Sequence, residues 1–407
     1  MKNYTLKLNS EYAGIFGTYW MYYGIISSFC SAYLLDIGYT NSEIGIILAV
    51  ASVVSVFLQP VLANMSDMSK KLDVISVAEI STVIMMVMQV GLFILKRKSA
   101  ALWVIYVLLM AWELALQPLF NSLARKLSES GSKINFGVCR AGGSLGYAVF
   151  TAIIGTFVEK NGTQILPKTG FVILALLLGM ILLCSRTLKR ALEERAVTAP
   201  GETFRDEEAE EISMMMFIKR NKLFILLNFF IMVLFFQNTI TNNFMYQIVT
   251  GVGGTSEDMG RIFGVMAALE IPGLFFFENI HKKFSCSTLL KFASAAFVGK
   301  VLTMYLANSV LMVYAAHFFQ LFSFSIFLAG IVQFITEIMD RGEAVRGQAL
   351  YTTAITIGGV FANIIGGMIL DISGPKTMLL VSTILTVIGA AGVFLLVGKI
   401  DKKSENP

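Results

Sequence analysis

Twelve apolar runs, spread along the whole chain, constrain its fold more than any other feature. Each is long enough for a helix to cross a hydrocarbon core about 30 Å thick, which takes about 20 residues. The first six lie near 12–35, 43–65, 73–95, 101–124, 136–158 and 169–186, and the second six lie near 223–249, 259–278, 287–307, 309–335, 347–370 and 377–398. The pattern predicts an all-α integral membrane protein with twelve transmembrane helices.

The composition agrees with a chain whose solvent is the lipid bilayer. Hydrophobic residues make up 56% of the 407 residues and charged residues 14%, and the mean hydropathy is +0.72. Soluble domains are only about 45–50% apolar. The net charge of +5 is explained by basic cytoplasmic loops rather than by nucleic-acid binding. The four cysteines have no CxxC spacing, so neither disulfides nor a metal site is expected.

One longer polar stretch divides the runs into two sets of six. We expect an N-terminal six-helix bundle over 1–186, a cytoplasmic central loop over 187–221 and a C-terminal six-helix bundle over 222–407. An even number of helices places both termini on one side. Most of the 32 Lys and Arg residues fall on the cytoplasmic side if the termini are cytoplasmic, as the positive-inside rule requires. The prediction is a multi-pass protein of the cell inner (plasma) membrane.

Two pairs of matching segments lie half a chain apart. In the first pair a proline is followed, at the same spacing, by two lysines, and in the second pair a phenylalanine precedes Ile-Ile-Gly. The pairs are Pro60 with Lys70-Lys71 against Pro272 with Lys282-Lys283, and 150–155 against 361–366. They predict two pseudo-symmetric halves in parallel repeat, an arrangement in which solute sites form near the membrane midplane where the repeats meet.

Ionisable residues inside the runs are site candidates, because each costs about 2.5–3.5 kcal/mol or more at the bilayer centre. They are Glu79, Glu113, Arg140, Glu270, Lys300 and His317. The guanidinium of Arg140 suits a carboxylate or vicinal hydroxyls. Tyr147, two turns further on, can stack under a sugar or base. The alternative is an Arg140 tied structurally to Glu113, with Tyr147 on a packing face.

Glu270 lies next to Pro272, where the helical hydrogen bonding is locally disturbed. Burial favours the neutral carboxyl and a nearby cation favours the charged one, a balance that suits proton coupling. The alternative is a permanent ion pair. The run at 223–249 adds a polar group that suits hydroxylated solutes or joins helices, namely Gln237, Asn238, Thr241, Asn242 and Asn243.

A nucleophile-elbow pattern, G-x-S-x-G, occurs at 142–146. The elbow needs a strand-to-helix turn, whereas this segment lies inside an apolar run, where small residues simply let another helix approach. We therefore expect no enzyme and no cofactor.

The segment Gln59-Pro-Val-Leu-Ala-Asn-Met-Ser-Asp67, followed by Lys70-Lys71, resembles the signature loop of the major facilitator superfamily. The segment Phe136–Tyr147, Phe263-Gly before Glu270, Lys300 and His317 resemble the lactose permease, or oligosaccharide:proton symporter, branch. The resemblance implies the major facilitator fold, with Asp67, Lys70 and Lys71 in a conformational loop.

The same resemblance assigns roles position by position. Arg140 matches a sugar-binding arginine and Tyr147 a stacking aromatic. Glu270 matches a carboxylate that binds sugar and couples protons, and Lys300 and His317 match coupling residues.

Two departures from the branch stand out. Asn121 occupies the place of the glutamate that pairs with the helix 5 arginine, so Glu113 is the replacement we expect. Gln320 occupies the place of the proton-carrying glutamate, and an amide does not titrate. These changes imply a different solute or a relocated proton site.

The sequence thus predicts a secondary active transporter that moves a small polar solute, a sugar or oligosaccharide, by alternating access with proton symport. Nucleoside or organic-anion uptake and drug efflux are the alternatives within transporters, and a non-transporting sensor is the alternative outside them. The expected partners are a small-molecule substrate, a proton and the lipid bilayer, and we expect a monomer.

Overall fold

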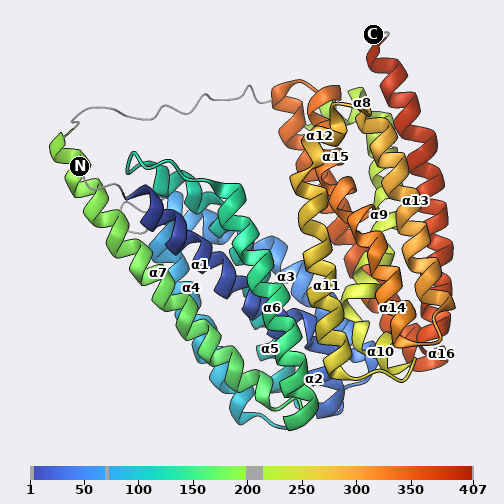
Figure 1. Ribbon diagram of the computed structural model, residues 1–407, viewed down its shortest axis with the longest axis horizontal. Coiled ribbons are helices and arrows are strands. Elements are labelled where there is room, and N and C mark those ends of the chain that lie inside the picture. The colour runs from blue at the N-terminus through green and yellow to red at the C-terminus, as the bar shows by residue number, and fades with distance from the viewer. Residues whose placement is uncertain (1–3, 69–72, 199–213, 406–407) are drawn as a thin grey trace. The chain divides into compact units, whose positions relative to one another are not determined.

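A computed structural model describes residues 4–68, 73–198 and 214–405, and it describes them as almost entirely helical. The chain clusters into two compact units. Unit 1 contains Met1–Tyr39 and Ile47–Asp206, and unit 2 contains Thr40–Ile46 and Glu207–Pro407. Each unit is a bundle of long helices (Figure 1).

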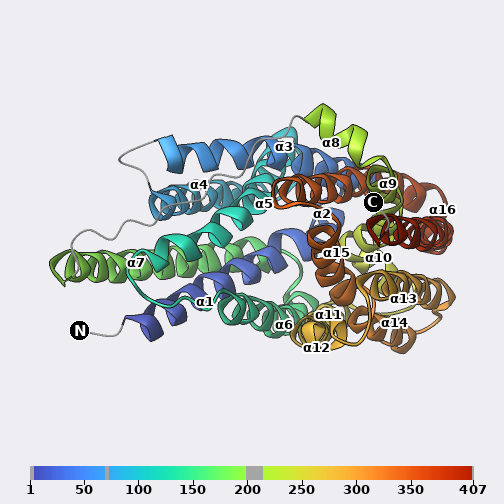
Figure 2. The same cartoon turned by 90° about the horizontal axis from the view of Figure 1, so that it is seen from above.

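Unit 1 begins with a broken helix and continues with five long ones. The first span consists of α1 (Thr5–Tyr23), a π-helical turn η1 (Gly24–Ser28) and α2 (Cys30–Ile37), and the others are α3 (Asn41–Met68), α4 (Val74–Ile94), α5 (Ala100–Ser128), α6 (Phe136–Asn161) and α7 (Ile165–Thr198). α1 packs against α6 and α7 (Figure 2), and α4 packs against α5 and α7.

Unit 2 has the same number of spans, and several of them are interrupted. They are α9 (Lys222–Asn243) with α10 (Met245–Thr250), α11 (Ser256–Phe275) with α12 (Phe277–His281), α13 (Cys286–Leu306), α14 (Val310–His317) with the 3-10 turn η2 (Phe318–Leu321) and α15 (Phe324–Ile338), and α16 (Arg341–Glu405), preceded by the short α8 (Met214–Arg220). α16 packs mainly against α9 and α13.

The predicted twelve transmembrane helices are confirmed. Within the described ranges, nine helices are long and apolar enough to cross a membrane by length and composition alone. Three further spans complete the set: the broken α1–α2 span, the charge-bearing α11, and the second half of α16. The continuous α16 is divided at Gly374, whose φ of 76° lies in the left-handed region that glycine tolerates best.

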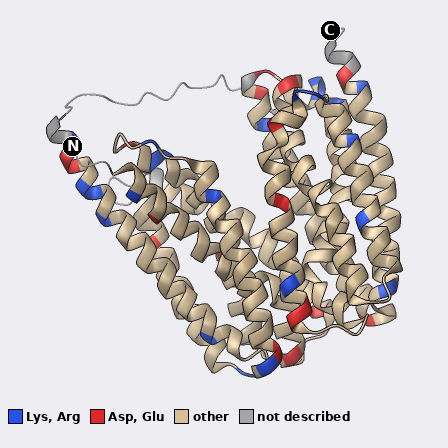
Figure 3. Ribbon diagram, in the orientation of Figure 1, with Lys and Arg blue, Asp and Glu red and all other residues tan. Residues whose placement is uncertain are grey.

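The outer faces of the spans carry large apolar side chains, as lipid-facing helices do. Phe57, Val87 and Leu311 are 71%, 69% and 77% exposed, whereas a soluble protein would bury such residues. Figure 3 shows that Lys, Arg, Asp and Glu gather near helix ends and that few lie within the spans.

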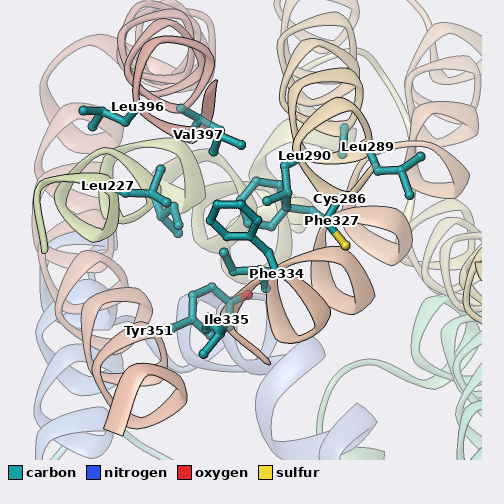
Figure 4. Packing of buried hydrophobic residues seen from close by; sticks show 14 of the residues in the cluster. Leu227, Cys286, Leu289, Leu290, Phe327, Phe334, Ile335, Tyr351, Leu396 and Val397 are labelled. Atoms are coloured by element: carbon teal, nitrogen blue, oxygen red, sulfur yellow. The ribbon is translucent and has the colours of Figure 1, made fainter. Parts of the chain in front are cut away.

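Aromatic and aliphatic side chains fill the interiors of the units. In unit 1, Tyr12, Phe16 and Phe120 are completely buried, and the Tyr12 hydroxyl donates to the Phe120 carbonyl at 2.7 Å. In unit 2, Figure 4 shows Phe327, Phe334 and Leu290 within one cluster to which several spans contribute.

The beginning of α3 is capped within unit 2. Thr40 and Glu43 form a reciprocal pair, because the Thr40 amide donates to Glu43 Oε2 at 2.9 Å and the Glu43 amide donates to Thr40 Oγ1 at 3.2 Å. The Asp371 carboxylate of α16 accepts from the amides of Asn41 and Ser42 at 3.0 and 2.8 Å. A carboxylate at a helix N-terminus satisfies free amides and complements the helix dipole.

The structure bears on two segments whose boundaries were predicted from the sequence, the central loop and the conformational loop. α7 continues to Thr198, so the first part of the stretch predicted as the central loop is helical; its Leu188 and Ala191 are 3% exposed, which shows that an apolar face continues past the run. The predicted conformational loop lies mostly outside the described residues: Lys70 and Lys71 are not described, and Asp67 is described only as a backbone position in α3.

Close packing between α9 and α16 generates a first prediction. A Cβ atom added at Gly389 would lie 2.5 Å from the backbone nitrogen of Leu234 and 2.7 Å from its Cα, so a backbone would have to shift. Overpacking of this kind costs about 1–3 kcal/mol. We expect Gly389→Ala to lower the melting temperature of the purified protein in detergent.

The matched control is Gly179→Ala in α7, where an added Cβ meets nothing within 4 Å. Alanine is the better helix former, so this variant is expected to melt at or above the wild-type temperature. Equal melting temperatures for the two variants would contradict the packing described here.

Candidate solute-binding site

An arginine surrounded by aromatic rings forms the polar centre of unit 1. The guanidinium carbon of Arg140, on α6, lies 4.4 Å from the centre of the Trp20 ring and 5.7 Å from that of Phe16. Cations are attracted to the faces of such rings. This arrangement fixes the orientation of the Arg140 side chain within the unit.

Trp20, which contacts Arg140, belongs to a group of three rings that lie close to one another. The ring centres of Trp20 and Tyr23 are 4.9 Å apart, those of Tyr23 and Tyr147 are 6.0 Å apart, and those of Trp20 and Tyr147 are 6.3 Å apart. Trp20 and Tyr23 are partly exposed, while Tyr147 is buried. We call Trp20, Tyr23, Tyr147 and Arg140 the aromatic cluster.

The π-helical turn η1 directly follows Tyr23 and changes the register of the first span. It brings the hydroxyl of Ser28 to 2.8 Å from the Tyr147 hydroxyl, and it lets the Ser27 hydroxyl donate to Glu113 Oε2 at 3.3 Å. Glu113, on α5, is completely buried, and its Oε1 has no hydrogen-bond partner among the described residues. Local π turns are frequent at functional sites.

A continuous hydrogen-bonded chain joins three spans of unit 2. The completely buried ammonium of Lys300, on α13, donates to Gln320 Oε1 at 2.7 Å. Gln320 Nε2 in turn donates to Glu270 Oε1, on α11, also at 2.7 Å. A side-chain amide is a neutral group whose oxygen accepts from a cation while its nitrogen donates to a carboxylate. Gln320 therefore connects Lys300 to Glu270 without adding a charge.

The span that carries Gln320 is interrupted at this position. α14 ends at His317, the 3-10 turn η2 covers Phe318–Leu321, and α15 begins at Phe324. The His317 ring is completely buried, with Nδ1 2.8 Å from the Val313 carbonyl oxygen. Since a carbonyl only accepts, Nδ1 carries the hydrogen, and Nε2 is left without a partner among the described residues.

The amides of α9 divide into two groups. Asn243 donates to Asn363 Oδ1 of α16 at 2.7 Å and so joins two helices. Gln237 is completely buried, yet neither amide atom has a partner in the described part of the chain, and the same holds for Oδ1 of Asn242. Buried amides are normally hydrogen-bonded, so Gln237 and Asn242 are the better candidates for contact with a polar solute.

The structure thus brings Arg140 and Tyr147 together in unit 1, and Glu270 and Lys300 together in unit 2. Asn121 is exposed on α5 and makes no hydrogen bond to the aromatic cluster among the described residues.

Sequence reasoning did not single out Trp20, Tyr23, Ser27 or Ser28. The aromatic run Tyr19-Trp20-Met21-Tyr22-Tyr23 in the first span was the available signal. Nothing in the sequence marked η1, which positions the two serines.

Polar clusters inside two helical units, with lipid-facing apolar side chains around them, are an arrangement that membrane transporters use. Residues 12–381 match the family described as the MFS_1 like family, and the chain belongs to that family. It is also 22% identical, over 95% of its length and 93% of the other protein, to the uncharacterized transporter YwbF of Bacillus subtilis strain 168.

Solved structures with similar folds support the same architecture. A point mutant of the nucleoside transporter NupG is similar with a TM-score of 0.80 at 13% identity, covering 96% of this chain and 99% of that one. A bacterial homolog of the human lysosomal transporter Spinster is similar with a TM-score of 0.70 at 14% identity, covering 99% and 98%. At these identities the likeness concerns the fold alone.

The Lys300–Gln320–Glu270 chain generates a second prediction. Gln320→Leu keeps the approximate volume but leaves a buried ammonium without its acceptor, and hydrogen bonds to charged groups contribute about 1.5–3 kcal/mol each. We expect a clear fall in melting temperature in detergent.

Gln237→Leu is the matched control, because Gln237 is equally buried but makes no hydrogen bond among the described residues that the change would remove. Its melting temperature is expected to stay unchanged or to rise. If Gln320→Leu and Gln237→Leu lower the melting temperature equally, the Lys300–Gln320–Glu270 hydrogen bonds make no specific contribution to stability.

Proposed function

We propose that this transporter moves a small hydroxylated solute, a sugar or oligosaccharide, across the plasma membrane by alternating access with proton symport. The aromatic cluster is the observation that carries the proposal. Aromatic faces pack against the apolar faces of sugar rings, and a guanidinium offers paired donors to hydroxyls. The aromatic cluster offers both within one unit.

Unit 2 has acceptors and donors of its own that suit the hydroxyl groups of such a solute. The Glu270 carboxylate accepts from hydroxyls, and the amides of Gln237 and Asn242 both donate and accept. We assign solute contact to Arg140, Tyr147 and Glu270, with Trp20 and Tyr23 as additional stacking residues. Both termini are cytoplasmic in this proposal, because the basic loops then obey the positive-inside rule.

Proton coupling is assigned to Glu270. Protonation of its carboxylate would weaken its hydrogen bond with Gln320, since a neutral acceptor binds a donor less strongly than a charged one. Gln320 and Lys300 would then be free to rearrange. The amide of Gln320 does not titrate. Glu270 therefore provides the titratable carboxyl in this chain of hydrogen bonds.

A nucleoside is the second candidate solute. A nucleoside joins a planar base to a hydroxylated ring, and three aromatic rings beside one arginine suit the base as well as they suit a sugar. The fold-level likeness to NupG, which is named a nucleoside transporter, adds modest support. A sugar and a nucleoside both present ring hydroxyl groups, and only the nucleoside carries a base.

The first test is an uptake screen in proteoliposomes with an imposed proton gradient. Labelled monosaccharides, disaccharides, nucleosides and organic acids are compared with and without the gradient. We expect a sugar to accumulate or, if the second candidate is right, a nucleoside. Accumulation is expected only with the imposed proton gradient. Accumulation of organic acids alone would overturn the proposal.

The second test concerns the assigned proton carrier. Glu270→Gln is expected to abolish accumulation against a gradient while retaining exchange of solute across the membrane, because the amide no longer titrates. Glu278→Gln, at an exposed position of α12, is the control and should accumulate solute as the wild type does. Undiminished proton-driven accumulation by Glu270→Gln would refute the assignment of the carrier.

A further inference from the structure

A histidine, a cysteine and a glutamate meet at one end of unit 2, outside the polar chain described above. The ligand atoms that His281, Cys286 and Glu337 can offer all lie within 4.8 Å of one another. The three residues come from α12, α13 and α15, whose ends meet near the label of α12, at the end of unit 2 that bears the C-terminus (Figure 1).

The distances suit a tetrahedral metal ion. His281 Nε2 lies 3.0 Å from Glu337 Oε1, and Cys286 Sγ lies 3.5 Å from both His281 Nδ1 and Glu337 Oε1. Zinc binds these atom types at 2.0–2.3 Å, so adjacent ligand atoms around it are about 3.3–3.8 Å apart. Cys286 Sγ and Glu337 Oε1 thus already stand at zinc spacing. His281 contacts them through different ring nitrogens, so it would bind the ion through one of these nitrogens after a small shift of its side chain.

We propose that His281, Cys286 and Glu337 bind a Zn²⁺ ion, with water as the fourth ligand. Nitrogen, thiolate and carboxylate together favour zinc over magnesium or calcium, which prefer oxygen ligands alone. Binding forms a zinc–sulfur bond and releases the thiol proton of Cys286 to solvent, so metal uptake is accompanied by proton release. The proposal is independent of the solute transported.

Neighbouring residues hold two of the three ligands in place. The His281 ring is stacked on that of Phe277, with ring centres 5.9 Å apart and planes 6° apart. Gln333 Nε2 donates to Glu337 Oε1 at 3.1 Å. Such supporting contacts orient ligands and raise metal affinity.

One of the three proposed ligands is buried, and the other two are accessible to solvent. Cys286 is buried in the apolar cluster of unit 2, beside Leu290 and Phe327 (Figure 4). The side chains of His281 and Glu337 are 28% and 40% exposed, which leaves a route for a hydrated ion. Since His281 and Cys286 flank the turn between α12 and α13, the metal would fix that turn to the end of α15.

The binding experiment uses the full chain, purified with a tag that contains no histidine. Zinc content after equilibration is measured by mass spectrometry, and Co²⁺ is used as a spectroscopic probe for thiolate ligation. We expect one ion per chain, a thiolate-to-cobalt charge-transfer band, proton release on binding and a rise in melting temperature with added Zn²⁺.

Three disruptive variants, one conservative variant and one control test the assignment of the ligands. His281→Gln, Cys286→Ser and Glu337→Gln should each weaken zinc binding at least tenfold, and Cys286→Ser should also lose the charge-transfer band. Glu337→Asp retains a carboxylate and should still bind. Cys184→Ser removes a buried cysteine of unit 1 and should bind as the wild type does.

Folding is checked by size exclusion and by the metal-free melting temperature of each variant. Wild-type protein that binds no zinc, or a well-folded Cys286→Ser that binds it unchanged, would overturn the proposal. The three residues would then be an ordinary hydrogen-bonded cluster.

Discussion

A hydrocarbon solvent offers no hydrogen bonds, and this constraint governs where the chain can depart from regular helix. Backbone groups released by a break must find partners inside the protein. The breaks at η1 and η2 accordingly lie beside polar side chains. All residues of η1 are buried, and Gln320 of η2 is buried although Phe318 of the same turn is 64% exposed. Ser27 and Ser28 in η1 contact Glu113 and Tyr147, and Gln320 in η2 contacts Lys300 and Glu270. The irregular backbone and the polar clusters therefore occur together for one physical reason.

The same constraint explains why Lys300 needs Gln320. A buried ammonium is costly unless acceptors surround it. A glutamate at position 320 would satisfy Lys300 but would stand beside Glu270, where two like charges destabilise each other. Glutamine satisfies both neighbours and leaves one titratable carboxyl in the chain of hydrogen bonds. The departure from the sugar-symporter pattern is thus consistent with its surroundings, and it concentrates any proton chemistry of this cluster on Glu270.

The sequence predicted the spans well because hydrophobicity over about 20 residues is a strong, local signal. It predicted Arg140, Glu270 and Lys300 as candidates because charges in such runs are rare. It missed Trp20 and Tyr23, since aromatic residues are ordinary in apolar helices and only tertiary packing places Trp20 beside Arg140 and Tyr23 beside Tyr147. It also missed the His281–Cys286–Glu337 cluster, because Glu337 comes from a span far along the chain. Contacts of this kind depend on packing, which no local pattern reveals.

The two units hold different chemistry although their spans repeat. Unit 1 presents rings and a guanidinium, which offer stacking faces and hydrogen-bond donors and do not change charge near neutral pH. Unit 2 presents a carboxylate linked by a neutral amide to a buried amine, a set whose hydrogen bonding changes when one proton arrives. The carboxyl to which we assign proton coupling thus lies in one unit, whereas side chains proposed to contact the solute lie in both. Glu113 is the exception that tests this division: it is a buried carboxyl of unit 1 with one oxygen unpartnered among the described residues. Its burial behind η1, with Ser27 as a donor, favours a role in holding the first span in register over one in carrying protons.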